Sequence, residues 1–168
     1  MPSERKPNRR NANDDLVDAV NRRLLLELQA DARLSLAELG RRVGLSAPAV
    51  GERLQRLQEA GVVRGYRAEL DPGALGLPLG VIIRVRPAAG ELHKVAELAR
   101  QTPEVVECHR ITGEDCFVMK LHLRDVEPME EVIDRFLLHG QTTTSIVQSS
   151  PVAARGVPLD AAGGHPSG

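Results

Sequence analysis

The chain has 168 residues, enough for one domain of average size or two small ones. Aromatic residues make up 2% and there is no Trp, so leucine, valine, isoleucine and alanine must build any core. No uninterrupted apolar run approaches the roughly 18 residues of a membrane span, and no apolar segment follows the basic start. We therefore expect a cytoplasmic protein without membrane association.

The net charge of −1 conceals an uneven distribution. Residues 1–67 contain 13 Lys and Arg against 9 Asp and Glu, whereas residues 68–168 contain 9 against 14. A basic half joined to an acidic half suggests that the first half meets a polyanion. A solvated charged surface gives similar counts, so at this point nucleic-acid binding is one of two interpretations.

Three helices are predicted within residues 14–61, where apolar residues recur at helical spacing. Ser35 and Glu38 form a capping box at the start of the second helix, and Pro48 lies in the first turn of the third. The expected N-caps are Asp18, Ser35 and Ser46, and the expected ends are Asp31, Gly44 and Gly61. A short Gly-containing turn between the last two helices is typical of a helix-turn-helix.

Residues 62–76 are predicted to form a small hairpin or linker strand, which would make the helix-turn-helix a winged type. Asp71-Pro72-Gly73 breaks this segment and marks the expected hinge. The two ends of the chain, 1–13 and 153–168, lack apolar periodicity and are predicted to be a disordered basic arm and a disordered tail.

Residues 77–152 are predicted to form a ferredoxin-like βαββαβ domain, so the fold class is α+β. The expected elements are a strand over 79–87, a helix over 90–101, a hairpin of 104–112 and 116–124, a helix over 128–138 and a strand over 142–150. Two helices on one sheet face leave the other face bare, with Ile82 and Val118 on it. Either Thr142, Thr144 and Ile146 or their alternates join them. A second copy of the domain is the simplest partner for that face.

The chain has no pattern of a metal site or a catalytic centre. Cys108 and Cys116 do not form a CxxC pair and are expected to be plain thiols. His109 is expected opposite Val118, away from His122, and the sequence has no HxH, HExxH, GxSxG or Walker-type motif. We expect neither a metal, a cofactor nor an enzymatic activity.

Five stretches, in the right order, resemble the leucine-responsive regulatory protein / asparagine regulator (Lrp/AsnC) family of transcription factors. They are residues 17–35, 36–46, 53–76, 105–125 and 142–147, and the resemblance spans about 17–150. One departure is Asn21, where the family usually has Asp. The resemblance implies a homodimer, often assembled into an octamer, that binds an amino acid or related metabolite between effector domains and acts on double-stranded DNA in the nucleoid.

The third helix is the expected recognition helix, with its N-terminal half in the major groove. Its outward candidates, together with two possible phosphate contacts on the second helix, are Arg41, Arg42, Ser46, Pro48, Ala49, Gly51, Glu52, Arg53 and Arg56. Few of them carry long polar side chains on the first turn, so DNA shape is expected to contribute to specificity.

The turn after the first hairpin strand is the expected effector site. A Gly-bearing turn exposes backbone N–H groups to a carboxylate, while Glu114 or Asp115 can accept an ammonium. By resemblance, a threonine-rich segment of a neighbouring subunit supplies hydroxyl groups. The candidate residues are Thr112, Gly113, Glu114, Asp115, Cys116, Thr142, Thr143 and Thr144.

Two alternatives to a metabolite-responsive regulator remain open at this stage. One is an architectural DNA-compacting protein without an effector. The other is an enzyme resembling siroheme decarboxylases, which share the fold and use His and Arg near the effector cleft; His109 and Arg110 are the residues that favour it.

Overall fold

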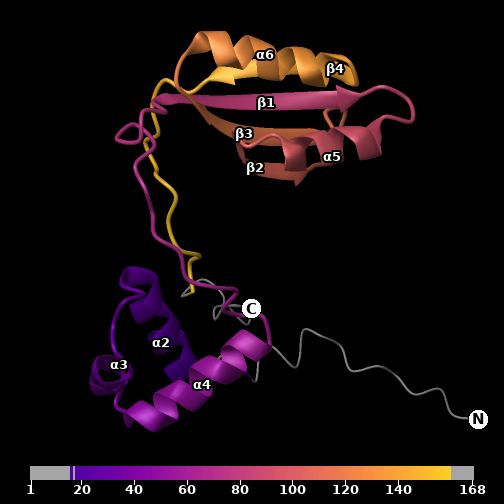
Figure 1. Ribbon diagram of the computed structural model, residues 1–168. Coiled ribbons are helices and arrows are strands. Elements are labelled where there is room, and N and C mark those ends of the chain that lie inside the picture. Colours follow the sequence, from indigo (N-terminus) through magenta and orange to yellow (C-terminus); the bar gives the residue numbers. More distant parts are fainter. Residues whose placement is uncertain (1–15, 17, 160–168) are drawn as a thin grey trace, which may run out of the picture. The chain divides into compact units, whose positions relative to one another are not determined.

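The computed structural model describes residues 16 and 18–159, divided into two compact units (Figure 1). One unit contains the chain up to Ala68 together with the segment from Ala154, and the other spans Glu69–Ala153. The predicted basic arm, 1–13, lies outside the described residues. Within the described part of the chain, no helix has the length and apolar character needed to cross a membrane.

The N-terminal unit contains three helices, α2 (Ala19–Ala30), α3 (Leu36–Val43) and α4 (Ala47–Glu59). Each begins at the predicted cap: Asp18, Ser35 and Ser46 accept hydrogen bonds from the backbone N–H groups of Asn21, Glu38 and Ala49. The predicted stripes meet in one core, formed by Leu24, Leu25, Leu39, Val43, Val50, Leu54 and Leu57. The helix-turn-helix prediction is confirmed.

Two glycines shape the turn between α3 and α4. Gly44 ends α3 with φ of 76°, a conformation that other residues rarely adopt. Gly40 is buried, and its carbonyl accepts a hydrogen bond of 2.9 Å from the Leu45 N–H. A Cβ atom at Gly40 would overlap the Leu45 carbonyl oxygen. The two helices can therefore approach this closely because residue 40 has no side chain.

Two predictions at the edges of this unit were wrong. Residues 62–76 contain no strand, because an extended segment needs a hydrogen-bonded neighbour to become one and the described chain offers none. The helix-turn-helix therefore has no wing here. The second error concerns the predicted disordered tail, since Leu159 packs against the helical core and its carbonyl accepts a hydrogen bond of 2.8 Å from Arg22. Residues 160–168 lie outside the described residues.

The C-terminal unit has the predicted βαββαβ order. Its elements are β1 (Leu79–Pro87), α5 (Leu92–Gln101), β2 (Val105–Arg110), β3 (Phe117–Leu123), α6 (Val126–Leu137) and β4 (Gly140–Ile146). The strand order is β2-β3-β1-β4, and every pairing is antiparallel. Helix α6 begins two residues earlier than predicted because Asp125 caps it, and β4 ends earlier, at Ile146.

Both helices cover the same face of the sheet. Val95 and Ala99 of α5, with Val132 and Phe136 of α6, pack on the alternating inward residues of β1 and β3. Those inward residues are Val81, Ile83, Val85, Phe117, Met119, Leu121 and Leu123. The opposite face carries Ile82 and Val118, as predicted, and no element of the described unit covers it.

We predict that Gly40→Ala destabilises the N-terminal unit by about 1–3 kcal/mol, because the added methyl group forces the helices apart. Gly51→Ala is the matched control. Its Cβ would make an ordinary contact of 3.5 Å with Leu36, so we expect it to be neutral or to stabilise the helix by about 0.5–1 kcal/mol. Thermal unfolding followed by circular dichroism measures both, and equal stabilities of the two variants would contradict this role of Gly40.

Candidate nucleic-acid interface and effector site

Helix α4 presents one polar face away from the core of its unit. Pro48, Glu52 and Arg56 are exposed and follow one another at helical spacing, and Glu52 and Arg56 lie 3.6 Å apart as an ion pair. Gln55 is also exposed on this side; sequence analysis missed it although it lies seven residues after Pro48. Ala49 and Gly51 are half-buried, and Gly51 lies against Leu36.

Arg53 does not lie on the outward face where it was predicted. Its guanidinium donates hydrogen bonds to Asp18 Oδ2, at 2.8 Å, and to Asn21 Oδ1, at 3.1 Å. The backbone N–H of Asn21, with Arg53, holds the pKa of the Asp18 carboxyl below its usual value. Arg53 thus connects α4 to the start of α2. The side-chain amide of Asn21 also donates to the Leu16 carbonyl at 2.7 Å.

The two arginines at the end of α3 differ in their ion-pair partners and in their exposure. Arg42 donates to Glu27 of α2 at 2.7 Å and to Glu38 at 2.8 Å, so it links two helices. Arg41 shares Glu38, but its side chain is 72% exposed and can turn toward a phosphate. The Arg41 and Arg42 guanidinium groups lower the pKa of Glu38 to about 2. Glu38 is therefore occupied with these arginines and does not complete the predicted capping box.

The candidate effector turn joins β2 to β3. Its ends are held by a hydrogen bond of 2.9 Å from the Ile111 N–H to the Cys116 carbonyl, and Gly113 has φ of 107°. Thr112, Glu114 and Gly113 are exposed, whereas Cys116 packs against the hydrophobic core. The space around Gly113 is open, so its positive φ, not a steric contact, is what selects glycine there.

Two arginines that sequence analysis missed lie beside this turn. Arg86 of β1 forms an ion pair with Glu114, and Arg84 Nε lies 3.8 Å from Asp115 Oδ2. The signal was present in the strand pattern, because residues 84 and 86 alternate with the inward Val85 and must face the bare side. Two guanidinium groups and two carboxylates thus form one cluster, called here the charged cluster: Arg84, Arg86, Glu114 and Asp115.

The threonines of β4 divide between the two faces of the sheet. Thr142 and Thr144 pair with the buried Val85 and Ile83, so they lie on the helix-covered face. Thr143 pairs with Arg84 and is exposed on the bare face, beside the charged cluster. The structure therefore brings Thr143, but neither Thr142 nor Thr144, to the side of the sheet where Arg84 lies.

His109 and His122 lie apart, as predicted. His109 pairs with Val118 in the strand register and its ring contacts the Glu107 carboxylate at 2.6 Å. Partial burial and, to a smaller extent, the positive charge of Lys120 lower the pKa of His122. The described residues contain no group of three or more His, Cys, Asp or Glu side chains that could hold a metal ion.

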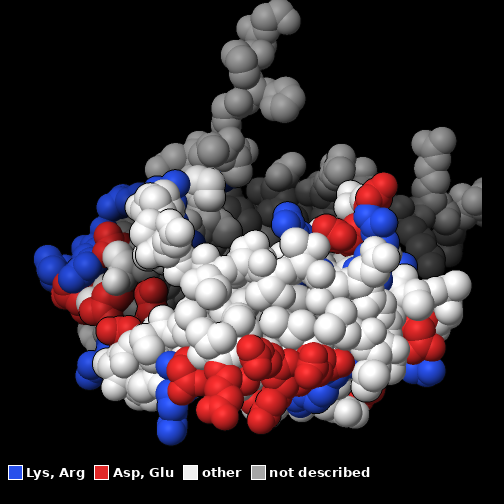
Figure 2. Space-filling view, turned by 90° about the horizontal axis from the view of Figure 1, so that it is seen from above, with Lys and Arg blue, Asp and Glu red and all other residues white. Residues whose placement is uncertain are grey.

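The surface charge differs between the units. Figure 2 shows a broad uncharged area with acidic side chains gathered along one of its edges and Lys and Arg side chains at others. In the sequence, the first 67 residues carry an excess of Arg and Lys and the remaining residues an excess of Asp and Glu, so the first part of the chain is the one suited to a polyanion. Fold and site together define a protein with a helix-turn-helix unit and a separate α+β unit that carries a charged cluster.

Comparison with known proteins places the chain in a family. Residues 17–58 match the AsnC-type helix-turn-helix domain, and residues 80–157 match the Lrp/AsnC ligand binding domain. The transcriptional regulator LrpC of Bacillus subtilis is 31% identical over 133 residues, which cover 79% of this chain and 92% of LrpC. The proline dehydrogenase transcriptional activator of Rhodobacter capsulatus is 35% identical over 150 residues, 86% of this chain and 97% of the relative. The chain belongs to the Lrp/AsnC family of transcriptional regulators.

Solved structures agree with this assignment. A transcriptional regulator of Neisseria meningitidis in complex with L-methionine superimposes with a TM-score of 0.81 at 30% identity, over 86% of this chain and 98% of its own. The feast or famine regulatory protein of Mycobacterium tuberculosis, also in complex with L-methionine, gives 0.79 at 29% identity, over 84% and 98%. The predicted family is confirmed, and so is the predicted α+β fold class with an N-terminal helix-turn-helix, apart from the wing.

We predict that Arg56→Gln and Arg53→Gln separate DNA contact from helix packing. If Arg56 contacts a base, Arg56→Gln should weaken DNA binding by about 1–3 kcal/mol. If Arg56 contacts phosphate, the slope of log K against log salt concentration should fall by about one unit. In both cases the folding stability should be unchanged. Arg53→Gln should cost up to about 1 kcal/mol of folding stability through its lost ion pair. Fluorescence anisotropy with labelled DNA and thermal unfolding give the two readouts. An Arg53→Gln variant of unchanged stability but impaired DNA binding would return Arg53 to the interface.

Proposed function

We propose that this regulator changes its DNA binding in response to an amino acid held at the charged cluster beside the Gly113 turn. The observation that carries the proposal is the cluster itself, in which Arg84 and Arg86 face Asp115 and Glu114. An amino acid carries one carboxylate and one ammonium. Its carboxylate can bind an arginine of the cluster while its ammonium binds an acidic side chain. L-methionine in two structurally similar family members supports this ligand class.

The cluster is suited to a reversible ligand because its own ion pairs are weak. The four side chains are between 35% and 82% exposed, and exposed pairs of this kind contribute about 0–1 kcal/mol. A ligand that excludes water while it replaces them gains stronger charge-assisted hydrogen bonds. Thr143 and the backbone N–H groups around Gly113 add neutral polar partners on the same side.

We further propose that two copies of the chain pair through the bare sheet face, so that the charged cluster lies at or near a subunit boundary. Ile82, Val118 and Val147 are apolar residues of that face, and ion pairs satisfy part of its polar side chains. A larger assembly such as an octamer would bring further copies of β4 toward the turn.

The charged cluster predicts the effect of two substitutions. Asp115→Asn should weaken binding of the amino acid by about 1.5–3 kcal/mol, because a charged hydrogen bond to the ammonium is lost. Gly113→Ala should also impair binding, since alanine is strained at positive φ and would shift the turn. A thermal-shift panel of amino acids identifies the ligand, and calorimetric titration then compares the variants. DNA binding without the ligand should survive in both; wild-type ligand affinity in both variants would contradict this location.

A charge introduced on the bare face should disrupt the assembly of two copies. Val118→Lys would place a third cation near Arg84 and Lys120 and should dissociate the dimer. Val126→Lys is the matched control, because Val126 is 48% exposed at the start of α6, away from that face. Light scattering on the full chain measures the mass of both. An unchanged mass for Val118→Lys would place the dimer interface elsewhere.

A further inference from the structure

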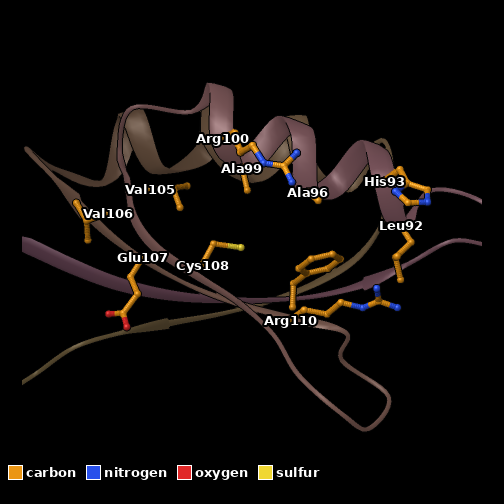
Figure 3. Close-up of a pocket in the computed structure, with 11 residues that line it drawn as sticks. Leu92, His93, Ala96, Ala99, Arg100, Val105, Val106, Glu107, Cys108 and Arg110 are labelled. Atoms are coloured by element: carbon orange, nitrogen blue, oxygen red, sulfur yellow. The ribbon is translucent and has the colours of Figure 1, made fainter. Parts of the chain in front are cut away.

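A groove lies between α5 and the edge strand β2, on the helix-covered side of the sheet (Figure 3). Its volume is about 480 Å³, within the range of cavities that hold small molecules. The charged cluster lies on the opposite face, so the groove is a separate place. None of the residues assigned to the amino acid site lines it.

The groove exists because α5 presents two alanines to the strand. Ala96 and Ala99 face β2 with single methyl groups, where a leucine on either position would fill the space. Leu92, Val105 and Phe117 complete an apolar lining. Such a surface favours a short hydrocarbon chain.

Two guanidinium groups reach this space from different walls. Figure 3 shows the Arg100 guanidinium extending over the groove from α5, and Arg110 of β2 running along its lower side toward Leu92. Arg100 is bonded to Glu97 at 2.9 Å, whereas no ion pair or hydrogen bond of the Arg110 side chain is found among the described residues. Arg110 therefore has its donors available for a carboxylate.

Glu107 is the one acidic residue among those that line the groove, and it pairs with neither arginine. Glu107 lies at the other end, and its carboxylate contacts the His109 ring at 2.6 Å and points away from both guanidinium groups (Figure 3). Between the two ends, the Cys108 sulfur points into the groove. Partial burial raises the pKa of the Cys108 thiol, which keeps it neutral and compatible with an apolar ligand body.

From this arrangement we propose that the groove between α5 and β2 is a second ligand site, which binds a small monocarboxylate with a short apolar chain. Arg110, assisted by Arg100, binds the carboxylate, and the alanine-lined wall receives the hydrocarbon. The proposal does not depend on the amino acid site at the Gly113 turn.

The Cys108 thiol provides a direct test in the full-length protein. The probe is 4-methylpentanoate, with 4-methylpentanamide as the control that has the same apolar body and no charge. The protein is labelled with N-ethylmaleimide, a neutral reagent, and tandem mass spectrometry assigns the label to Cys108 or to Cys116. The carboxylate should slow labelling of Cys108 in a saturable manner and leave Cys116 unchanged, whereas the amide should protect neither.

Three variants sharpen the test. Arg110→Gln should raise the carboxylate concentration needed for protection by about tenfold or more. Ala96→Leu should abolish saturable protection by filling the groove, and Arg124→Gln, which removes an exposed arginine outside it, should behave as wild type. Circular dichroism confirms that each variant is folded. Absence of protection in wild type, equal protection by the amide, or an unchanged response of Arg110→Gln would each overturn the proposal.

Discussion

Two helices can cover only one face of a four-stranded antiparallel sheet, and much of this molecule follows from that constraint. Val81, Ile83 and Val85 are buried beneath α5 and α6, so the residues between them must face the other way. The bare face therefore receives Arg84 and Arg86, which pair with the acidic turn. A face that combines apolar side chains with a neutralised charged cluster can meet a second copy and a small zwitterion together.

In the DNA-binding unit, too, packing between the elements limits which side chains remain exposed. Its short helices bury one core between them, and the turn from α3 to α4 requires Gly40 and Gly44. Arg53 and Arg42 are used to connect helices through Asp18, Asn21, Glu27 and Glu38. Among the described residues of α3 and α4, few exposed polar side chains that could donate to DNA then remain, among them Arg41, Ser46, Gln55 and Arg56. This agrees with the expectation that DNA shape contributes to recognition.

Local chemistry made most of the fold predictable. The caps at Asp18, Ser35 and Ser46 and the alternation along β1 and β3 depend on neighbouring residues, and all were anticipated. Contacts between distant residues were not: Arg53 meets Asp18 across 35 positions, and Arg86 meets Glu114 across 28. The sequence did not show which face of the sheet each β4 threonine occupies. Alternation shows that neighbouring residues of a strand point to opposite faces, but not which of the two sets faces the helices.

The most direct test of the account is DNA binding by the purified full-length protein, with and without the amino acid that the thermal-shift panel identifies. Fragments of the source genome are selected on the protein, and the enriched sequence is titrated against random DNA at fixed salt. The account predicts a preference of at least about 10³ for the enriched sequence. It also predicts that the amino acid alters that binding in wild type and does so much less in Asp115→Asn. Equal affinity for all DNA, or a response that is identical in the two proteins, would contradict it.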